Sequence, residues 1–111
     1  MQKSAGNKVE EYANYIMKNV PTSAILCQLA EECSELSQAA LKLVRVIDRV
    51  NPTTVSKQAA IDNLWEEIAD VNVCLLCLRE FINDKTFLNV EICKREKIER
   101  WAKRLAKMGK S

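Results

Sequence analysis

The sequence predicts an all-α protein folded as an antiparallel four-helix bundle. Apolar residues recur with the period of an α-helix along nearly the whole chain of 111 residues, and no segment alternates as a strand would. The chain contains 2 Gly and 2 Pro, too few for the many tight turns of a β-sandwich or barrel. Its length suits a single domain covering residues 1–111.

The first two predicted helices are separated by Pro21. The first helix carries one apolar stripe, made of Val9, Tyr12, Ala13, Ile16 and Val20. Pro21 should end it, because the proline ring disfavours helical geometry in the residue before it. Thr22 or Ser23 should cap the second helix, which has a broad apolar face. That helix should run to about Val50, where an Asn-Pro pair stops it.

The third and fourth helices each follow a short polar segment. The third helix has three candidate N-terminal caps, Thr53, Thr54 and Ser56. Its apolar stripe extends to about Ile82, and residues 83–86 form a polar break before the fourth helix. Gly109 is placed as the C-terminal cap of that helix. The apolar residues expected to face inward there are Val90, Cys93, Ile98, Trp101, Leu105 and Met108.

The composition excludes several classes of active site. The chain has no histidine, which rules out Ser-His-Asp and Cys-His catalysis, histidine-rich zinc sites and haem held by a histidine. Its 5 cysteines, irregularly spaced, are unlike a secreted disulfide framework. Cys74 and Cys77 lie on an apolar helix, where burial in the core is expected rather than zinc or redox chemistry. No membrane span or signal peptide is found, so a cytoplasmic protein is expected.

Charge is distributed unevenly along the chain. Between Lys94 and Ser111, eight basic and two acidic residues give a net charge of +6, which leaves −4 for residues 1–93 of a chain with a total of +2. A basic segment of this kind can bind an anionic ligand. No nucleic-acid partner is expected, because no DNA- or RNA-binding motif is present and the acidic remainder would repel a nucleic acid.

Two acidic pairs lie within apolar stretches of the second and third helices. Glu32 and Glu35 are three residues apart and share a helix face, and Glu67 and Asp70 have the same spacing. If these helices pack antiparallel, the pairs can converge, and their carboxylates would repel one another unless cations neutralise them. Oxygen ligands alone suit a hard cation such as Mg²⁺. Either pair by itself is more simply a solvated helix surface, whereas the two together favour a cation site.

The stretches EECSELSQAALK (31–42) and NLWEEIADV (63–71) resemble the MazG-like branch of the all-α nucleoside triphosphate pyrophosphohydrolases. The C-terminal KIERWAKR (97–104) is similar to the helix ending of many small members. The resemblance spans roughly residues 23–105, with Ser34 where many relatives have glycine and a longer connection between the acidic pairs than in the tightest members. It implies a MazG-like fold and hydrolysis of a (d)NTP to (d)NMP and pyrophosphate.

The resemblance and the spacing together nominate site residues. The Mg²⁺ ligands are expected to be Glu32, Glu35, Glu67 and Asp70, with Mn²⁺ as a substitute ion. Glu35 and Glu32 are the catalytic candidates, and Glu35 is the favoured base for the attacking water. Three cations are placed to bind phosphate or to form a solvated basic surface, namely Lys42, Lys97 and Arg100. Gln28 and Asn63, each four residues before a proposed ligand, are candidates for base or sugar contacts.

The apolar faces of the second and third helices are too broad for a small bundle to cover, so a homodimer is expected. The resemblance also favours an oligomer and adds a homotetramer, because tetramers occur among MazG-like proteins. Trp65 is expected in the core or in a subunit contact, and basic residues of the fourth helix would complete a neighbour's site. Two other functions stay open. One is a non-catalytic helical module of the same fold that binds a partner or a nucleotide, and the other is a helical protein whose acidic pairs hold a structural cation.

Overall fold

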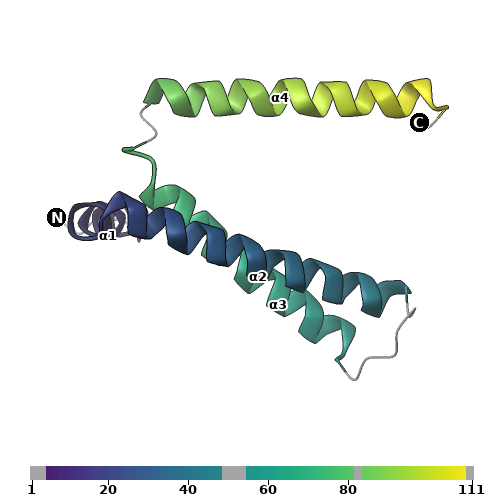
Figure 1. Ribbon diagram of the computed structural model, residues 1–111, viewed down its shortest axis with the longest axis horizontal. Helices are drawn as coiled ribbons and strands as arrows, with labels where there is room; N and C mark the ends of the chain where they lie inside the picture. Colours follow the sequence, from purple (N-terminus) through teal and green to yellow (C-terminus); the bar gives the residue numbers. More distant parts are fainter. Residues whose placement is uncertain (1–4, 49–54, 82–83, 110–111) are drawn as a thin grey trace. The chain divides into compact units, whose positions relative to one another are not determined.

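Four α-helices make up the computed structural model, which describes residues 5–48, 55–81 and 84–109 (Figure 1). The helices are α1 (Ala5–Asn19), α2 (Thr22–Asp48), α3 (Lys57–Cys77) and α4 (Asp84–Lys107). No strand occurs within the described ranges, so the predicted all-α class is confirmed. The chain divides into two compact units, residues 1–78 and residues 79–111. A single domain and a single antiparallel bundle of all four helices stay predictions.

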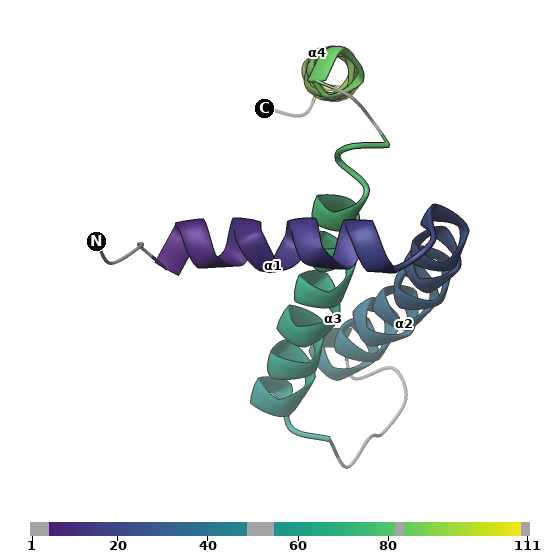
Figure 2. The ribbon, with the colours of Figure 1, turned by 90° about the vertical axis from the view of Figure 1, so that its left-hand side faces the viewer.

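The first unit is built on an antiparallel hairpin of α2 and α3. The two helices lie side by side and run in opposite directions (Figures 1 and 2). Ala39 of α2 and Ala60 of α3 are only 2% and 1% exposed, and these small side chains allow the two backbones to approach closely. The hairpin therefore brings one face of α2 against one face of α3 over several turns.

α1 crosses α3 and contacts it (Figure 2). Ala13 of α1 is buried, whereas Tyr12 and Tyr15 on the same helix are exposed. α1 ends two residues before Pro21, as the proline predicts. The N-cap prediction for α2 is wrong, because Thr22 and Ser23 lie inside the helix and the Pro21 carbonyl accepts the N–H groups of Ala24 and Ile25.

The remaining helix ends agree with the predictions in part. Ser56 caps α3, since its Oγ accepts the N–H of Ala59 at 3.1 Å; the other two candidate caps and the predicted end of the second helix lie outside the described residues. α3 ends at Cys77 rather than near residue 82, because the Leu78 N–H turns back to the carbonyls of the preceding turn. α4 begins at Asp84, inside the predicted polar break, which contains no glycine or proline to prevent a helix. Gly109 has a φ of +77°, as a C-terminal cap requires.

The buried core is small. Within the described residues it consists of Ala13, Ile25, Ala39, Ala60, Cys74, Cys77 and Leu78. The predicted burial of the two cysteines of α3 is confirmed. In the second unit, by contrast, the apolar residues of α4 that were expected to face inward are exposed, because this helix makes up most of its unit. No helix in the described residues has the length and apolar content to cross a bilayer; a cytoplasmic location stays a prediction.

Candidate metal centre

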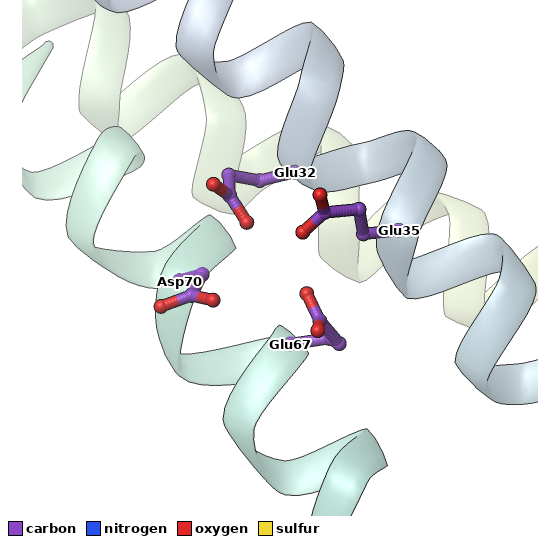
Figure 3. Close-up of side chains that lie close together, drawn as sticks. All are labelled: Glu32, Glu35, Glu67 and Asp70. Carbon is purple, nitrogen blue, oxygen red and sulfur yellow. The ribbon is translucent and has the colours of Figure 1, made fainter.

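The hairpin places the two acidic pairs opposite each other. Glu32 and Glu35 extend from α2 toward Glu67 and Asp70 of α3, and the four side chains point into one space (Figure 3). One carboxylate oxygen from each residue lies within 4.8 Å of those of the other three. The convergence follows from the antiparallel packing, in which Glu32 faces Asp70 and Glu35 faces Glu67.

Two of the four carboxylates each have an oxygen without a partner. Glu32 Oε2 and Glu67 Oε2 are inaccessible to solvent and accept no hydrogen bond within the described part of the chain. The other oxygen of Glu32, Oε1, accepts a hydrogen bond of 2.6 Å from Gln28 Nε2. A charged oxygen removed from water without a donor is costly, and a bound cation would remove that cost.

The surroundings of Glu32 act on its pKa in opposite directions. The hydrogen bond from Gln28 lowers the pKa of Glu32, whereas partial burial and the negative charges of Glu35 and Asp70 raise it. The net effect is a pKa above the ordinary value of 4.5. The folded chain therefore holds a proton on Glu32 more tightly than a solvated glutamate would, as expected of crowded carboxylates without a cation.

Cys74 lies next to this cluster but is not a nucleophile. Burial raises the pKa of the Cys74 thiol, and the negative charge of Glu32 raises it further. The thiol therefore stays protonated at neutral pH. The ligand set is thus made of carboxylate oxygens, which suit Mg²⁺ or Mn²⁺ better than a soft metal ion.

The site has a buried side and an open side. Glu32 and Glu67 are half-buried, whereas Glu35 and Asp70 are exposed. The two half-buried carboxylates can bind an ion from the buried side. The open side can admit water or other oxygen ligands, which Mg²⁺ usually retains in proteins. The residues present therefore fit a hard cation such as Mg²⁺ that keeps part of its coordination open to other oxygen ligands.

A cleft of about 480 Å³ extends from the cluster along α2 toward its C-terminal end. Glu35 and Glu67 belong both to the cluster and to the wall of this cleft. The positively charged residues in the wall are Lys42 and Arg45. We call this cavity the basic cleft. Lys42 is one of the predicted phosphate ligands, whereas Arg45 was missed by the sequence analysis. Its position three residues after Lys42, on the same side of the helix, was the available signal.

A second cavity, of about 240 Å³, lies at the other end of the cluster. It is bounded mainly by apolar side chains of α1, α2 and α3, and we call it the apolar groove; its lining is Ile16, Val20, Ala24, Ile25, Gln28, Val73, Cys74 and Cys77. Gln28 lines this groove, whereas Asn63 lines the basic cleft. The two residues nominated for base or sugar contacts thus lie at opposite ends of the cluster.

The two other predicted phosphate ligands belong to the second unit. Lys97 and Arg100 lie one turn apart on α4, in a basic stretch that also contains Trp101 and Lys103. Trp101 is exposed there, and Trp65 of the hairpin is 63% exposed and therefore outside the core of its own unit. A contribution of Lys97 and Arg100 to the carboxylate site stays a prediction.

Comparisons of the chain with protein families, with curated proteins and with solved structures found no match. The resemblance to the MazG-like enzymes therefore stays a prediction from three short stretches of sequence. The functional assignment depends on what the carboxylate cluster and its two neighbouring cavities can do chemically.

Proposed function

We propose that the protein is a Mg²⁺-dependent nucleoside triphosphate pyrophosphohydrolase that converts a (d)NTP to (d)NMP and pyrophosphate. The observation that carries the proposal is the convergence of four carboxylates, two of them with inaccessible and unpartnered oxygens. The basic cleft beside them adds a site for an anion. A cation site next to an anion site suits the magnesium complex of a nucleotide, and the stretches that resemble MazG-like enzymes contain the same carboxylates.

The four carboxylates would hold Mg²⁺, or Mn²⁺ in its place. The ion would neutralise phosphate charge and lower the pKa of a water molecule in the site. Glu35 belongs both to the cluster and to the wall of the basic cleft, so it can take the proton of a water that attacks the α-phosphorus. The bond from that phosphorus to the oxygen bridging to the β-phosphate breaks, and pyrophosphate leaves. Glu32, fixed by Gln28, orients the site beside Glu35.

The direct test is release of pyrophosphate from a panel of canonical and damaged nucleoside triphosphates, with and without Mg²⁺. We expect turnover of at least one substrate, with one pyrophosphate and one monophosphate formed per triphosphate and no turnover after chelation. Release of inorganic phosphate instead would indicate cleavage at another bond. Binding of Mg²⁺ or nucleotide without turnover of any substrate would replace the proposal with a structural cation site or a non-catalytic module.

We further propose that the protein is a homodimer or homotetramer that buries an apolar face of the hairpin. Six residues form this face, and their side chains are 41% to 63% exposed: Leu26, Val44, Ile47, Trp65, Ile68 and Leu75. Since each residue turns a helix by about 100°, they lie on the flanks of α2 and α3 directed away from the acidic pairs. A second copy can therefore cover this face without blocking the carboxylates.

Replacing Ile68 with lysine is expected to dissociate this assembly, because an unpaired charge buried in an apolar interface costs several kcal/mol. Light scattering coupled to gel filtration should report the monomer mass for Ile68→Lys at micromolar concentrations. Ser34→Lys is the matched control, since Ser34 is an exposed residue of α2 that belongs neither to the apolar face nor to the acidic pair. A wild-type chain that is already monomeric at high concentration would contradict the interface.

A further inference from the structure

The two cavities that adjoin the carboxylate cluster differ in chemistry and lie at its opposite ends. The basic cleft begins at Glu35 and Glu67, which form part of its wall. The apolar groove begins at the other end, where Gln28 donates its hydrogen bond to Glu32 and where Cys74 follows Asp70 by one helical turn. A ligand that spans the cluster would therefore place one end among cations and the other among apolar side chains.

A nucleotide has the same division, with an anionic phosphate chain at one end and, at the other, a flat aromatic base whose two faces are apolar. We propose that the substrate lies in one orientation, in which Lys42 and Arg45 bind the β- and γ-phosphates and the apolar groove receives the nucleobase. This inference rests on the proposed function and adds to it the direction of the substrate, a new phosphate-binding residue and the helices that determine base selectivity.

Arg45 and Lys42 are positioned to bind the leaving pyrophosphate. Side chains on a helix lean toward its N-terminus, so both cations on α2 lean toward the turn that carries Glu35. Within the described residues, neither cation forms an ion pair with a carboxylate, so their charge is available to a ligand. The guanidinium of Arg45 offers two parallel N–H donors to a phosphate, whereas the ammonium of Lys42 acts as a point charge.

The apolar groove is suited to a flat base rather than to phosphate. Most of its side chains come from three helices, and its lining includes Ile16 of α1 and Val20, the residue that follows α1, neither of which any motif in the sequence nominates. The volume of about 240 Å³ is below the usual range for drug-sized ligands and suits a single ring system. The Nε2 of Gln28 is engaged with Glu32, so its amide oxygen is the group that can accept a hydrogen bond from a base. Asn63, in the basic cleft, belongs with the phosphates instead.

Product inhibition tests this orientation, because pyrophosphate and nucleoside monophosphate occupy different ends of the site. With the best triphosphate from the panel as substrate, Arg45→Ala should raise the inhibition constant of pyrophosphate about tenfold or more and leave that of the monophosphate within twofold. Arg45→Lys should recover part of the loss. Lys8→Ala, which removes an exposed positive charge that lines neither cavity, should leave both constants unchanged.

Ile16→Trp should produce the converse result. A larger side chain at this position fills the apolar groove, so inhibition by the monophosphate should weaken about tenfold while inhibition by pyrophosphate stays within twofold. Val9→Trp, at an exposed site on the same helix outside the groove, is the matched control. Circular dichroism and melting curves should show that all variants fold.

The outcomes separate this inference from the proposed function. If the wild-type protein turns over a triphosphate but Arg45→Ala leaves pyrophosphate inhibition unchanged, or weakens only inhibition by the monophosphate, the orientation is wrong and the pyrophosphohydrolase proposal stands. Loss of monophosphate inhibition in Arg45→Ala together with loss of pyrophosphate inhibition in Ile16→Trp would reverse the orientation. A wild-type protein that turns over no triphosphate would overturn both.

Discussion

Glu67→Gln is expected to slow pyrophosphate release by about a thousandfold, whereas Glu66→Gln is expected to leave it within about twofold. Glu67 is half-buried in the cluster and its Oε2 has no hydrogen-bond donor in the described residues, so it is suited to bind a cation directly. An ion in such a site contributes several kcal/mol to stabilisation of the transition state, and each 1.4 kcal/mol is about a tenfold change in rate. Glutamine keeps the size of the side chain and removes its charge.

The comparison with Glu66→Gln separates loss of a metal ligand from the general effect of removing one negative charge from α3. Glu66 is the preceding residue on α3, it is exposed, and its substitution changes the net charge of the chain by the same amount. Steady-state kinetics should be measured for both variants over a range of Mg²⁺ concentrations, and Mg²⁺ binding should be followed by calorimetry. Equal activity of the two variants, or unchanged Mg²⁺ affinity in Glu67→Gln, would show that the cluster is not the metal centre.

The second large effect is expected in thermal unfolding, a measurement that needs no substrate. Mg²⁺ at about a hundred times its dissociation constant is expected to raise the melting temperature of the wild-type protein by about 10 °C. Glu32→Gln should melt at a higher temperature than the wild type without metal, because it relieves repulsion by Glu35 and Asp70, and it should lose most of the rise with Mg²⁺. Glu31→Gln, at the exposed neighbouring position, should behave as the wild type does.

The difference in melting temperature between the wild type and Glu32→Gln without metal should depend on pH in a defined direction. The pKa of Glu32 is raised above 4.5 in the folded protein, so the folded state binds a proton more tightly than the unfolded state. The resulting stabilisation is complete below pH 4.5 and is lost as the pH rises through the higher pKa of the folded state. Without metal, the melting temperature of the wild type should therefore fall relative to that of Glu32→Gln as the pH rises toward neutral.

Protonation and Mg²⁺ compete for the same oxygens. The rise in melting temperature with Mg²⁺ should consequently shrink as the pH falls, because protonated carboxylates are poor ligands. Differential scanning fluorimetry at several pH values, with and without Mg²⁺, measures both effects on the three proteins. A wild-type protein with the same melting temperature in Mg²⁺ and in chelator at neutral pH would argue against any cation site in the cluster.

Much of the hairpin could be predicted from residue order because helices depend mainly on local chemistry. Apolar periodicity predicted four helices, and the helix ends marked by Pro21 and Gly109 agree with the structure. The spacing of the acidic pairs indicated a shared face on each helix, since residues three apart lie on the same side. The end of α3 could not be predicted in the same way, because its apolar pattern continues past Cys77 and the turn at Leu78 depends on backbone hydrogen bonds.

The position of Arg45 in a cleft beside the cluster, and the existence of the apolar groove, could not be predicted from the spacing of residues on single helices. Arg45 has the same local signature as any cation on a helix surface, and only the packing of α3 against α2 places it in a cleft with Glu35 and Glu67. Ile16 and Val20 reach the other cavity because α1 crosses α3, an arrangement that depends on contacts far apart in the chain. Gln28 and Asn63 have equivalent positions relative to the acidic pairs, yet antiparallel packing sends them to opposite ends.

The sequence by itself determined the helical class, the absence of histidine chemistry and the two acidic pairs, because these follow from composition and from the geometry of a single helix. Only the tertiary structure decided that the four carboxylates meet within 4.8 Å and that two of their oxygens lose access to water. The physical reason is that repulsion and burial act between helices, so their strength depends on how closely and in which direction α2 and α3 pack.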